Sequence, residues 1–294
     1  MARQHGVIER SQALRCGLSP RQIERIVGRG EWVRVMPRVC VQAGSPRTWE
    51  QHLAVVLAWA GEGSAATGTT AGFLHGLIED RPKEITIWSP RHVRSDGVRV
   101  LRGTPPRPGD FVTVRGFRAA HPCRVMIELA GEINEAALEE ALHVGINRRL
   151  LTPERVRRRI ESLGTSGRRG SGVLLELVDL CPPNPPESRN ETRVLRILRR
   201  LGPPFPEVQY RVVLFGEVYR LDFAYPQRRK TVEADSHRHH VLPDDFERNL
   251  RKRDALRRAG WDLCSVSAKL VTSSSPEAER VLGDFLHGPQ SFPF

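Results

Sequence analysis

Three carboxylates, Asp222, Glu233 and Asp235, lie close together in the segment YRLDFAYPQRRKTVEAD of a strongly basic chain. Mg²⁺ binds one or two carboxylates in proteins, together with water and substrate phosphate oxygens. A divalent ion on a phosphodiester polarises the phosphoryl group and generates hydroxide near neutral pH. The residue types therefore predict a site for Mg²⁺ or Mn²⁺ with these acids as ligands. Three separately solvated acids on an exposed sheet face are the alternative.

The turn between the acids sets their register. Residues 226–229, PQRR, predict a four-residue hairpin loop, so that Tyr225 pairs with Lys230. Asp222 then lies directly opposite Glu233, and both share one face of the sheet with Asp235. Like charges in that position are destabilising, and a cation relieves the repulsion. The other face is expected to be core and carries the apolar side chains of both strands: Leu221, Phe223, Tyr225, Val232 and Ala234.

Histidines and basic residues follow the acids. The loop SHRHH offers a general base from His237, His239 or His240, with His239 as the candidate. The helix DDFERNLRKRDALRRAG can supply positive charge through Lys252, Arg248 or Arg251. The two arginines are also candidate phosphate contacts. A polar loop and a solvated helix face are the alternatives.

A Pro-rich segment, CPPNPPESRN, precedes the elements that must position these groups. Ser188 and Glu191 have the spacing of a capping box at the start of the next helix, which is a structural role for Glu191. The pattern from there predicts helix, three strands, helix and strand, with a mixed sheet.

The N-terminal segment predicts a small DNA-binding unit. Ser19 is a good N-cap, and Pro20 suits the first position of the helix that follows. Arg21, Arg25 and Arg29 line one face of that helix, and the segments WVRV and RVCV follow as short strands. This is the order of a winged helix-turn-helix, so the arginines are candidate DNA contacts. A solvated helix face is the alternative.

The whole chain is expected to be α+β, with an N-terminal winged helix-turn-helix, an α/β middle region and a C-terminal mixed sheet flanked by helices. The predicted domains are residues 1–45, 46–180 and 187–294. His75 and His143 lie in apolar helical surroundings, where packing is the expected role. The net charge of +12 favours a polyanion partner, nucleic acid first. Five scattered cysteines, no apolar membrane span and no apolar signal core favour the cytoplasm.

Two segments resemble known families. The pattern D-x(10)-E-x-D, with Glu191 on the preceding helix and Gly260–Trp261 after the basic helix, resembles the actinobacterial endonuclease-like domain family. That family is related to the very-short-patch repair endonucleases and lies within the PD-(D/E)XK superfold. The segment GVIERSQALRCGLSPRQIERIVGRGEWVRVMPRVCV, with TTAGFLHGL after it, resembles the winged-helix region of AbiEi-type antitoxins. The resemblances cover about residues 185–270 and 1–80.

The endonuclease resemblance implies Asp222 and Glu233 as metal ligands and Glu191 as a carboxylate at the rim of the site. Asp235 stands where the common E-x-K motif has lysine, although this family typically has E-x-D. An acid cannot stabilise the phosphorane charge, so the positive role stays open. Lys252, Arg248 or Arg251 could supply the charge, and His237, His239 or His240 could serve as general base or ligand.

We expect a metal-dependent DNA endonuclease that acts in defence, restriction or repair. A non-catalytic DNA-binding regulator of antitoxin type, with a vestigial nuclease domain, is the alternative. An RNA-processing nuclease would share the same chemistry. A toxin or another defence-system protein is an expected partner, a membrane is not, and reading of a palindromic site would require a homodimer.

Overall fold

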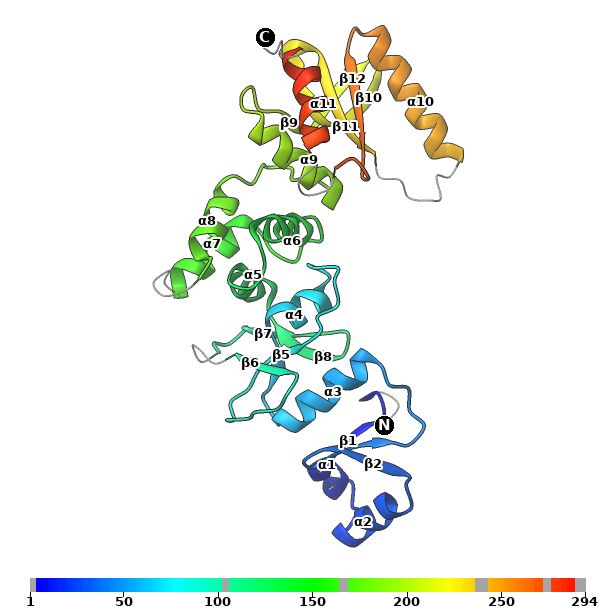
Figure 1. Ribbon diagram of the computed structural model, residues 1–294, viewed down its shortest axis with the longest axis vertical. Helices are drawn as coiled ribbons and strands as arrows, with labels where there is room; N and C mark the ends of the chain where they lie inside the picture. Colours follow the sequence, from blue (N-terminus) through cyan, green and yellow to red (C-terminus); the bar gives the residue numbers. More distant parts are fainter. Residues whose placement is uncertain (1–3, 102–105, 164–168, 236–242, 272–275, 289–294) are drawn as a thin grey trace. The chain divides into compact units, whose positions relative to one another are not determined.

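The computed structural model describes residues 4–101, 106–163, 169–235, 243–271 and 276–288. The chain divides into two compact units, one of residues 1–133 and 158–171 and the other of residues 134–157 and 172–294. Each unit contains helices and sheet strands, so the expected α+β class is confirmed (Figure 1). The three predicted domain ranges stay predictions. No helix within the described ranges is long and apolar enough to cross a membrane.

The first unit begins with a short strand, after which two short helices and a strand pair follow in the predicted order. Its elements are β1 (Val7–Glu9), α1 (Arg10–Arg15), α2 (Pro20–Gly28), β2 (Trp32–Met36) and β3 (Val39–Gln42). The strands form an antiparallel sheet in the order β1-β3-β2. Ser19 and Gln22 exchange side-chain and backbone hydrogen bonds, so the predicted cap of α2 is formed. The sequence does not predict β1, because a strand of 3 residues is too short to show alternation.

A second sheet completes the first unit. Its elements are α3 (Trp49–Ala60), β4 (Ala65–Ala66), α4 (Gly68–His75), β5 (Ile85–Trp88), β6 (Val98–Leu101), β7 (Phe111–Val114), β8 (Phe117–Ala120) and α5 (Pro122–Ala130). The strand order is β6-β5-β4-β8-β7, with parallel and antiparallel pairs. His75 is buried and its Nε2 lies 2.8 Å from the carbonyl oxygen of Ala120, so its predicted packing role is confirmed. α7 (Pro153–Leu163) contributes residues to both units.

The second unit has the predicted order of helix, three strands, helix and strand. Its elements are α6 (Glu135–Asn147), α8 (Ser171–Asp179), α9 (Arg189–Arg200), β9 (Glu207–Leu214), β10 (Glu217–Tyr225), η2 (Pro226–Arg228), β11 (Lys230–Asp235), α10 (Pro243–Arg258), β12 (Asp262–Ser267) and α11 (Pro276–His287). The sheet order is β12-β11-β10-β9, and only the β11–β12 pair of these neighbours is parallel. The expected mixed sheet is therefore observed.

Helices cover both faces of this sheet (Figure 1). Phe223, Tyr225 and Val232 pack on one face against apolar residues of α9 and α11. Leu221 and Ala224 pack on the other face against Leu256 of α10. The face that carries the acids is therefore partly covered by α10 rather than open to solvent.

The predicted register of the hairpin is confirmed, because Tyr225 pairs with Lys230 and Phe223 with Val232. One detail of the face assignment is wrong. Leu221 was expected beside Phe223 but packs on the opposite face of the sheet. The β9–β10 ladder is interrupted between these two residues, opposite Gln209 of β9, which has a φ of +53°. A left-handed residue breaks the alternation of side chains along a strand.

Candidate functional site

Asp222 and Glu233 form the centre of the candidate site. The backbone N–H of Asp222 donates to Oε1 of Glu233 over 3.3 Å. The backbone N–H of Ala234 donates to Oδ2 of Asp222 over 3.0 Å. Each carboxylate thus accepts a hydrogen bond from the backbone of the strand opposite, which holds the two acids side by side.

Lys252 of α10 reaches this pair from above the sheet. Its Nζ lies 2.5 Å from Oε2 of Glu233, and the exposed fractions of the two side chains are 18% and 15%. Lys252 and Leu256 are four residues apart on α10, so they share the helix face that packs on the sheet. The packing of Leu256 therefore fixes where the ammonium group of Lys252 lies. This ion pair brings one of the predicted positive groups to the acids.

Glu191 joins the site from the start of α9. The Oγ of Ser188 accepts from the backbone N–H of Glu191 over 3.1 Å, so the predicted N-cap is formed. The Glu191 carboxylate does not close the capping box. Its Oε2 accepts from the backbone N–H of Glu187 at 2.8 Å and from Nε2 of Gln209 at 2.7 Å.

The electrostatics of the three acids are unfavourable. Burial raises the pKa of Glu191, and the negative charge of Asp222 raises it further. Burial also raises the pKa of Asp222, although the backbone N–H of Ala234 and the charge of Lys252 act in the opposite direction. Burial and the charge of Asp222 together raise the pKa of Glu233 to about 7 despite the ion pair with Lys252. Ionisation of all three acids is therefore disfavoured, mainly by burial and in part by the charge of Asp222.

Asp222 and Glu233 fit the protein share of a magnesium site. Mg²⁺ uses one or two carboxylates and takes its remaining ligands from water and phosphate. A cation at this pair would compete with Lys252 for Glu233. The described part of the chain contains no group of three or more His, Cys, Asp or Glu side chains placed to hold a metal ion. Asp235 lies exposed at the end of β11.

The structure places the other predicted residues as follows. His239 lies in the segment 236–242, outside the described residues. Arg248 and Arg251 are exposed on α10, and Nη2 of Arg251 lies 3.4 Å from a carboxylate oxygen of Glu247. Arg21 and Arg25 are exposed on α2. Arg29 follows α2 as its C-cap, and its guanidinium lies 3.9 Å from the carboxylate of Glu31.

Gln209 is a site residue that the sequence does not reveal. It is 8% exposed and binds Glu191 through its amide nitrogen. In EVQYRVVL it occupies an ordinary strand position, and regular alternation would not direct it to the acids. The left-handed φ that redirects the chain has no local signal, because glycine, asparagine and aspartate are the residues expected there.

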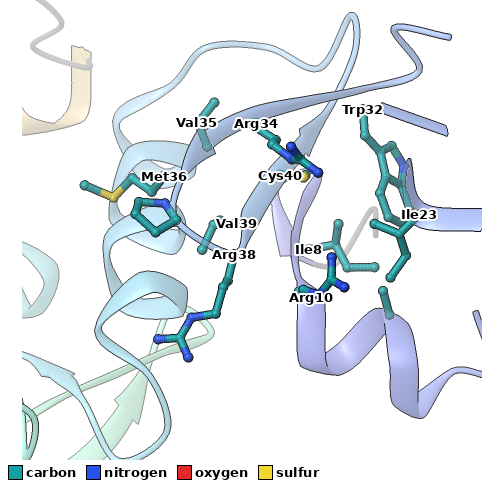
Figure 2. Close-up of a pocket in the computed structure, with 12 residues that line it drawn as sticks. Ile8, Arg10, Ile23, Trp32, Arg34, Val35, Met36, Arg38, Val39 and Cys40 are labelled. Atoms are coloured by element: carbon teal, nitrogen blue, oxygen red, sulfur yellow. The ribbon is translucent and has the colours of Figure 1, made fainter. Parts of the chain in front are cut away.

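A separate hollow of about 640 Å³ lies in the first unit, between α1, α2 and the β2–β3 hairpin (Figure 2). Its lining is mainly apolar, with Ile23, Trp32 and Val39 among the lining residues. Arg10 and Arg34 lie on its wall, and both donate to the carboxylate of Glu24 on α2. These bonds tie α2 to α1 and β2, and they hold the helix whose exposed face carries Arg21 and Arg25.

Comparison with known proteins finds a family match in the middle of the chain. Residues 64–177 match the family described as the AbiEi antitoxin C-terminal domain. Two uncharacterized proteins of Mycobacterium tuberculosis, from strains CDC 1551 / Oshkosh and H37Rv, are each 31% identical over 101 residues. That alignment covers 34% of this chain and 37% of each relative, so the chain matches little more than a third of their length.

The matched family supports the antitoxin-like part of the expected resemblance but changes its position. The resemblance was placed on residues 1–80 and on a winged-helix region, whereas the match covers the antitoxin C-terminal domain and overlaps that range only at residues 64–80. Asp222, Glu233 and Lys252 lie outside the match. The chain thus contains a segment similar to antitoxin C-terminal domains, followed by a sheet that carries a half-buried acidic site.

Proposed function

We propose that this protein is a divalent-metal-dependent DNA endonuclease of a toxin–antitoxin or other defence system. The observation that carries the proposal is the opposed pair Asp222 and Glu233, largely buried and neutralised only in part by Lys252. A protein gains no stability from uncompensated buried acids, so a cation that binds between them explains why they are there. The element order of the second unit, like its mixed sheet, is compatible with the restriction-endonuclease superfold.

Asp222 and Glu233 would hold Mg²⁺ or Mn²⁺, which supplies Lewis acidity and lowers the pKa of bound water. Lys252 is positioned to stabilise negative charge on the phosphoryl group, in place of the lysine that is missing at Asp235. Asp235 remains a proposed third ligand and His239 a proposed general base. Glu191, held by Gln209, would bound the site on the α9 side.

DNA binding is the second part of the proposal. The helices α1 and α2, the hairpin of β2 and β3, and β1 beside it favour a winged helix. In that arrangement α2 would present Arg21 and Arg25 to DNA, with Arg29 at its end, while Arg248 and Arg251 of α10 would contact phosphates near the acids. The net charge of +12 supports a polyanionic partner.

Cleavage of supercoiled plasmid tests the nuclease. Wild type should nick the plasmid with Mg²⁺ or Mn²⁺ and not with EDTA, and Asp222→Ala and Glu233→Ala should each lose the activity. Asp284→Ala, which removes an acid of α11, should cleave like wild type. Activity that survives in both acid variants would refute the assignment of the site.

A non-catalytic DNA-binding regulator is the second candidate. It is favoured by the 2.5 Å ion pair of Lys252 with Glu233, which gives the acid a partner without any metal, and by the antitoxin-like segment. Salt-sensitive DNA binding that is unchanged in Asp222→Ala, with no cleavage of plasmid, modified, mismatched or single-stranded DNA, would establish this function instead.

A further inference from the structure

The strand pairing of β9 and β10 is interrupted beside the acids of the candidate site. In the β9–β10 ladder Leu221 pairs with Tyr210 and Phe223 with Val208, but no pair joins the two residues between them, Asp222 and Gln209. Tyr210 and Leu221 pack toward α10, whereas Val208 and Phe223 pack toward α9 and α11. In both strands, therefore, the regular alternation of side chains between the two faces of the sheet is interrupted, in β10 at Asp222 and in β9 at Gln209.

At this interruption the backbone of Gln209 has an unfavourable conformation. Gln209 has a φ of +53°, which residues with a long side chain seldom adopt. Such conformations persist only where the surrounding structure imposes them, and they concentrate at functional sites. Here the consequence is local, because Gln209 is directed into the interior beside Glu191.

The nitrogen and the oxygen of the Gln209 side-chain amide have different surroundings. Its Nε2 donates to Oε2 of Glu191 over 2.7 Å, and because a carboxylate accepts hydrogen bonds, the amide oxygen must face elsewhere. That oxygen is buried and has no hydrogen-bond donor among the residues the structure describes. A buried carbonyl oxygen without a donor is costly, so it indicates a ligand that supplies one. The residue is 8% exposed, and it lies opposite Asp222, because its neighbours on β9 pair with the neighbours of Asp222 on β10.

We propose that Gln209 is a positioning residue of the carboxylate site, which orients Glu191 through its amide nitrogen and offers its amide oxygen to water around a divalent cation at Asp222 and Glu233. This inference rests on the proposed metal site and extends it by one residue. Groups that orient the ligands of a metal ion typically change its affinity 10- to 100-fold when they are replaced.

Two substitutions separate this role from a purely structural one. Gln209→Asn keeps an amide and suits a left-handed backbone, but its side chain is too short to reach Glu191 as Gln209 does. Gln209→Met keeps the length of the side chain and removes both polar groups. Gln51→Met is the matched control, since Gln51 is also a buried glutamine whose amide nitrogen makes hydrogen bonds, to His5 and Ser45, in the first unit.

The measurement is Mn²⁺ binding to the full chain by calorimetry, together with the midpoint of thermal unfolding without metal. We expect Gln209→Asn to unfold at the wild-type temperature or above it and to bind Mn²⁺ about tenfold more weakly. Gln209→Met should weaken Mn²⁺ binding as much and unfold at a lower temperature. Gln51→Met should lower only the unfolding temperature.

Wild-type affinity in both Gln209 variants would overturn this inference and leave the metal site in place. Absence of Mn²⁺ binding in wild type would overturn the metal site itself, and the positioning role with it. Asp222→Ala distinguishes specific from adventitious binding of Mn²⁺. Specific binding must be lost in that variant, whereas adventitious binding would be unchanged.

Discussion

Two pairs of buried acids in the second unit have opposite surroundings. Glu139 and Glu140 of α6 are 2% and 8% exposed, and arginines of α9 surround them. Glu139 accepts from Arg196 and Arg199 at 3.0 and 2.6 Å. Glu140 accepts from Arg193 and, more distantly, from Arg189. At Asp222 and Glu233, Lys252 is the one described cation that bonds to either carboxylate, and it bonds to Glu233.

The comparison shows that burial alone does not mark a functional acid. The α6 acids are the more deeply buried, and burial raises the pKa of Glu139 as well, but each of them pairs with two arginines, so their role is to hold α6 against α9. The acids of the sheet are less buried and retain excess negative charge, so they are the ones that a cation would stabilise. Charge balance rather than depth of burial separates the two pairs.

The largest effect is expected at the α6–α9 contact. Glu139→Ala leaves Arg196 and Arg199 without their buried partner, which should lower the free energy of unfolding by about 3–5 kcal/mol. Urea denaturation measures this. Glu135→Ala is the control, because Glu135 also pairs with Arg196 but its side chain is 58% exposed, and about 0–1 kcal/mol is expected there. Equal losses in the two variants would show that the buried ion pairs of Glu139 do not hold α6 against α9.

A pH dependence is expected at the same contact. Burial lowers the pKa of His143 to about 3, and its Nδ1 lies 3.0 Å from Oγ1 of Thr192. Below pH 6.5 the unfolded chain binds a proton at this histidine that the folded chain does not, so stability is present above that pH and is lost as the pH falls. Between pH 7.5 and 5 the loss is about 2 kcal/mol.

His143→Gln removes this titration and retains a hydrogen-bonding group for Thr192. The raised pKa values of Glu191, Asp222 and Glu233 act in the opposite direction, because folded acids that hold protons more tightly gain stability as the pH falls. The test is therefore the difference between wild type and His143→Gln, measured by urea denaturation at pH 7.5 and 5. The same pH dependence in both proteins would show that His143 is not kept neutral by the fold.

The order of elements and the hairpin register could be predicted from the sequence. PQRR is a strong turn signal between alternating strands, so Asp222 and Glu233 could be placed opposite each other before any coordinates were known. The cap at Ser19 likewise follows from local residue types.

Two features of the site could not be predicted, because they depend on contacts between distant segments. The rotation of α10 that brings Lys252 onto Glu233 is set by the packing of Leu256 on the sheet. The left-handed φ of Gln209 contradicts its local preference and exists only because the surrounding sheet imposes it. The burial of Glu139 and Glu140 similarly requires the arginines of α9, far along the chain.

A substitution of Lys252 tests the charge balance of the candidate site. Lys252→Met removes the positive charge that competes with a cation for Glu233, so Mn²⁺ should bind roughly tenfold more tightly. Plasmid cleavage should nevertheless fall, because the variant lacks the group that stabilises charge on the phosphoryl oxygens. Calorimetry and the cleavage assay on one preparation check both. Tighter Mn²⁺ binding with full cleavage would assign Lys252 to charge balance alone.

The smallest effect, at Asp222, has an unusual sign. Asp222→Asn keeps an oxygen that can accept from the backbone N–H of Ala234 and removes one of two like charges. The free energy of unfolding at pH 7 without metal should therefore rise, by about 1 kcal/mol, because the charge of Asp222 contributes to the raised pKa of Glu233. Mn²⁺ should stabilise wild type and not the variant.

Glu140→Gln is the matched change in the other pair, and it should lower stability because its arginines lose their charge partner. A loss of stability in both variants would mean that the acids of the sheet are as well compensated as those of α6, and the case for a cation between Asp222 and Glu233 would fail.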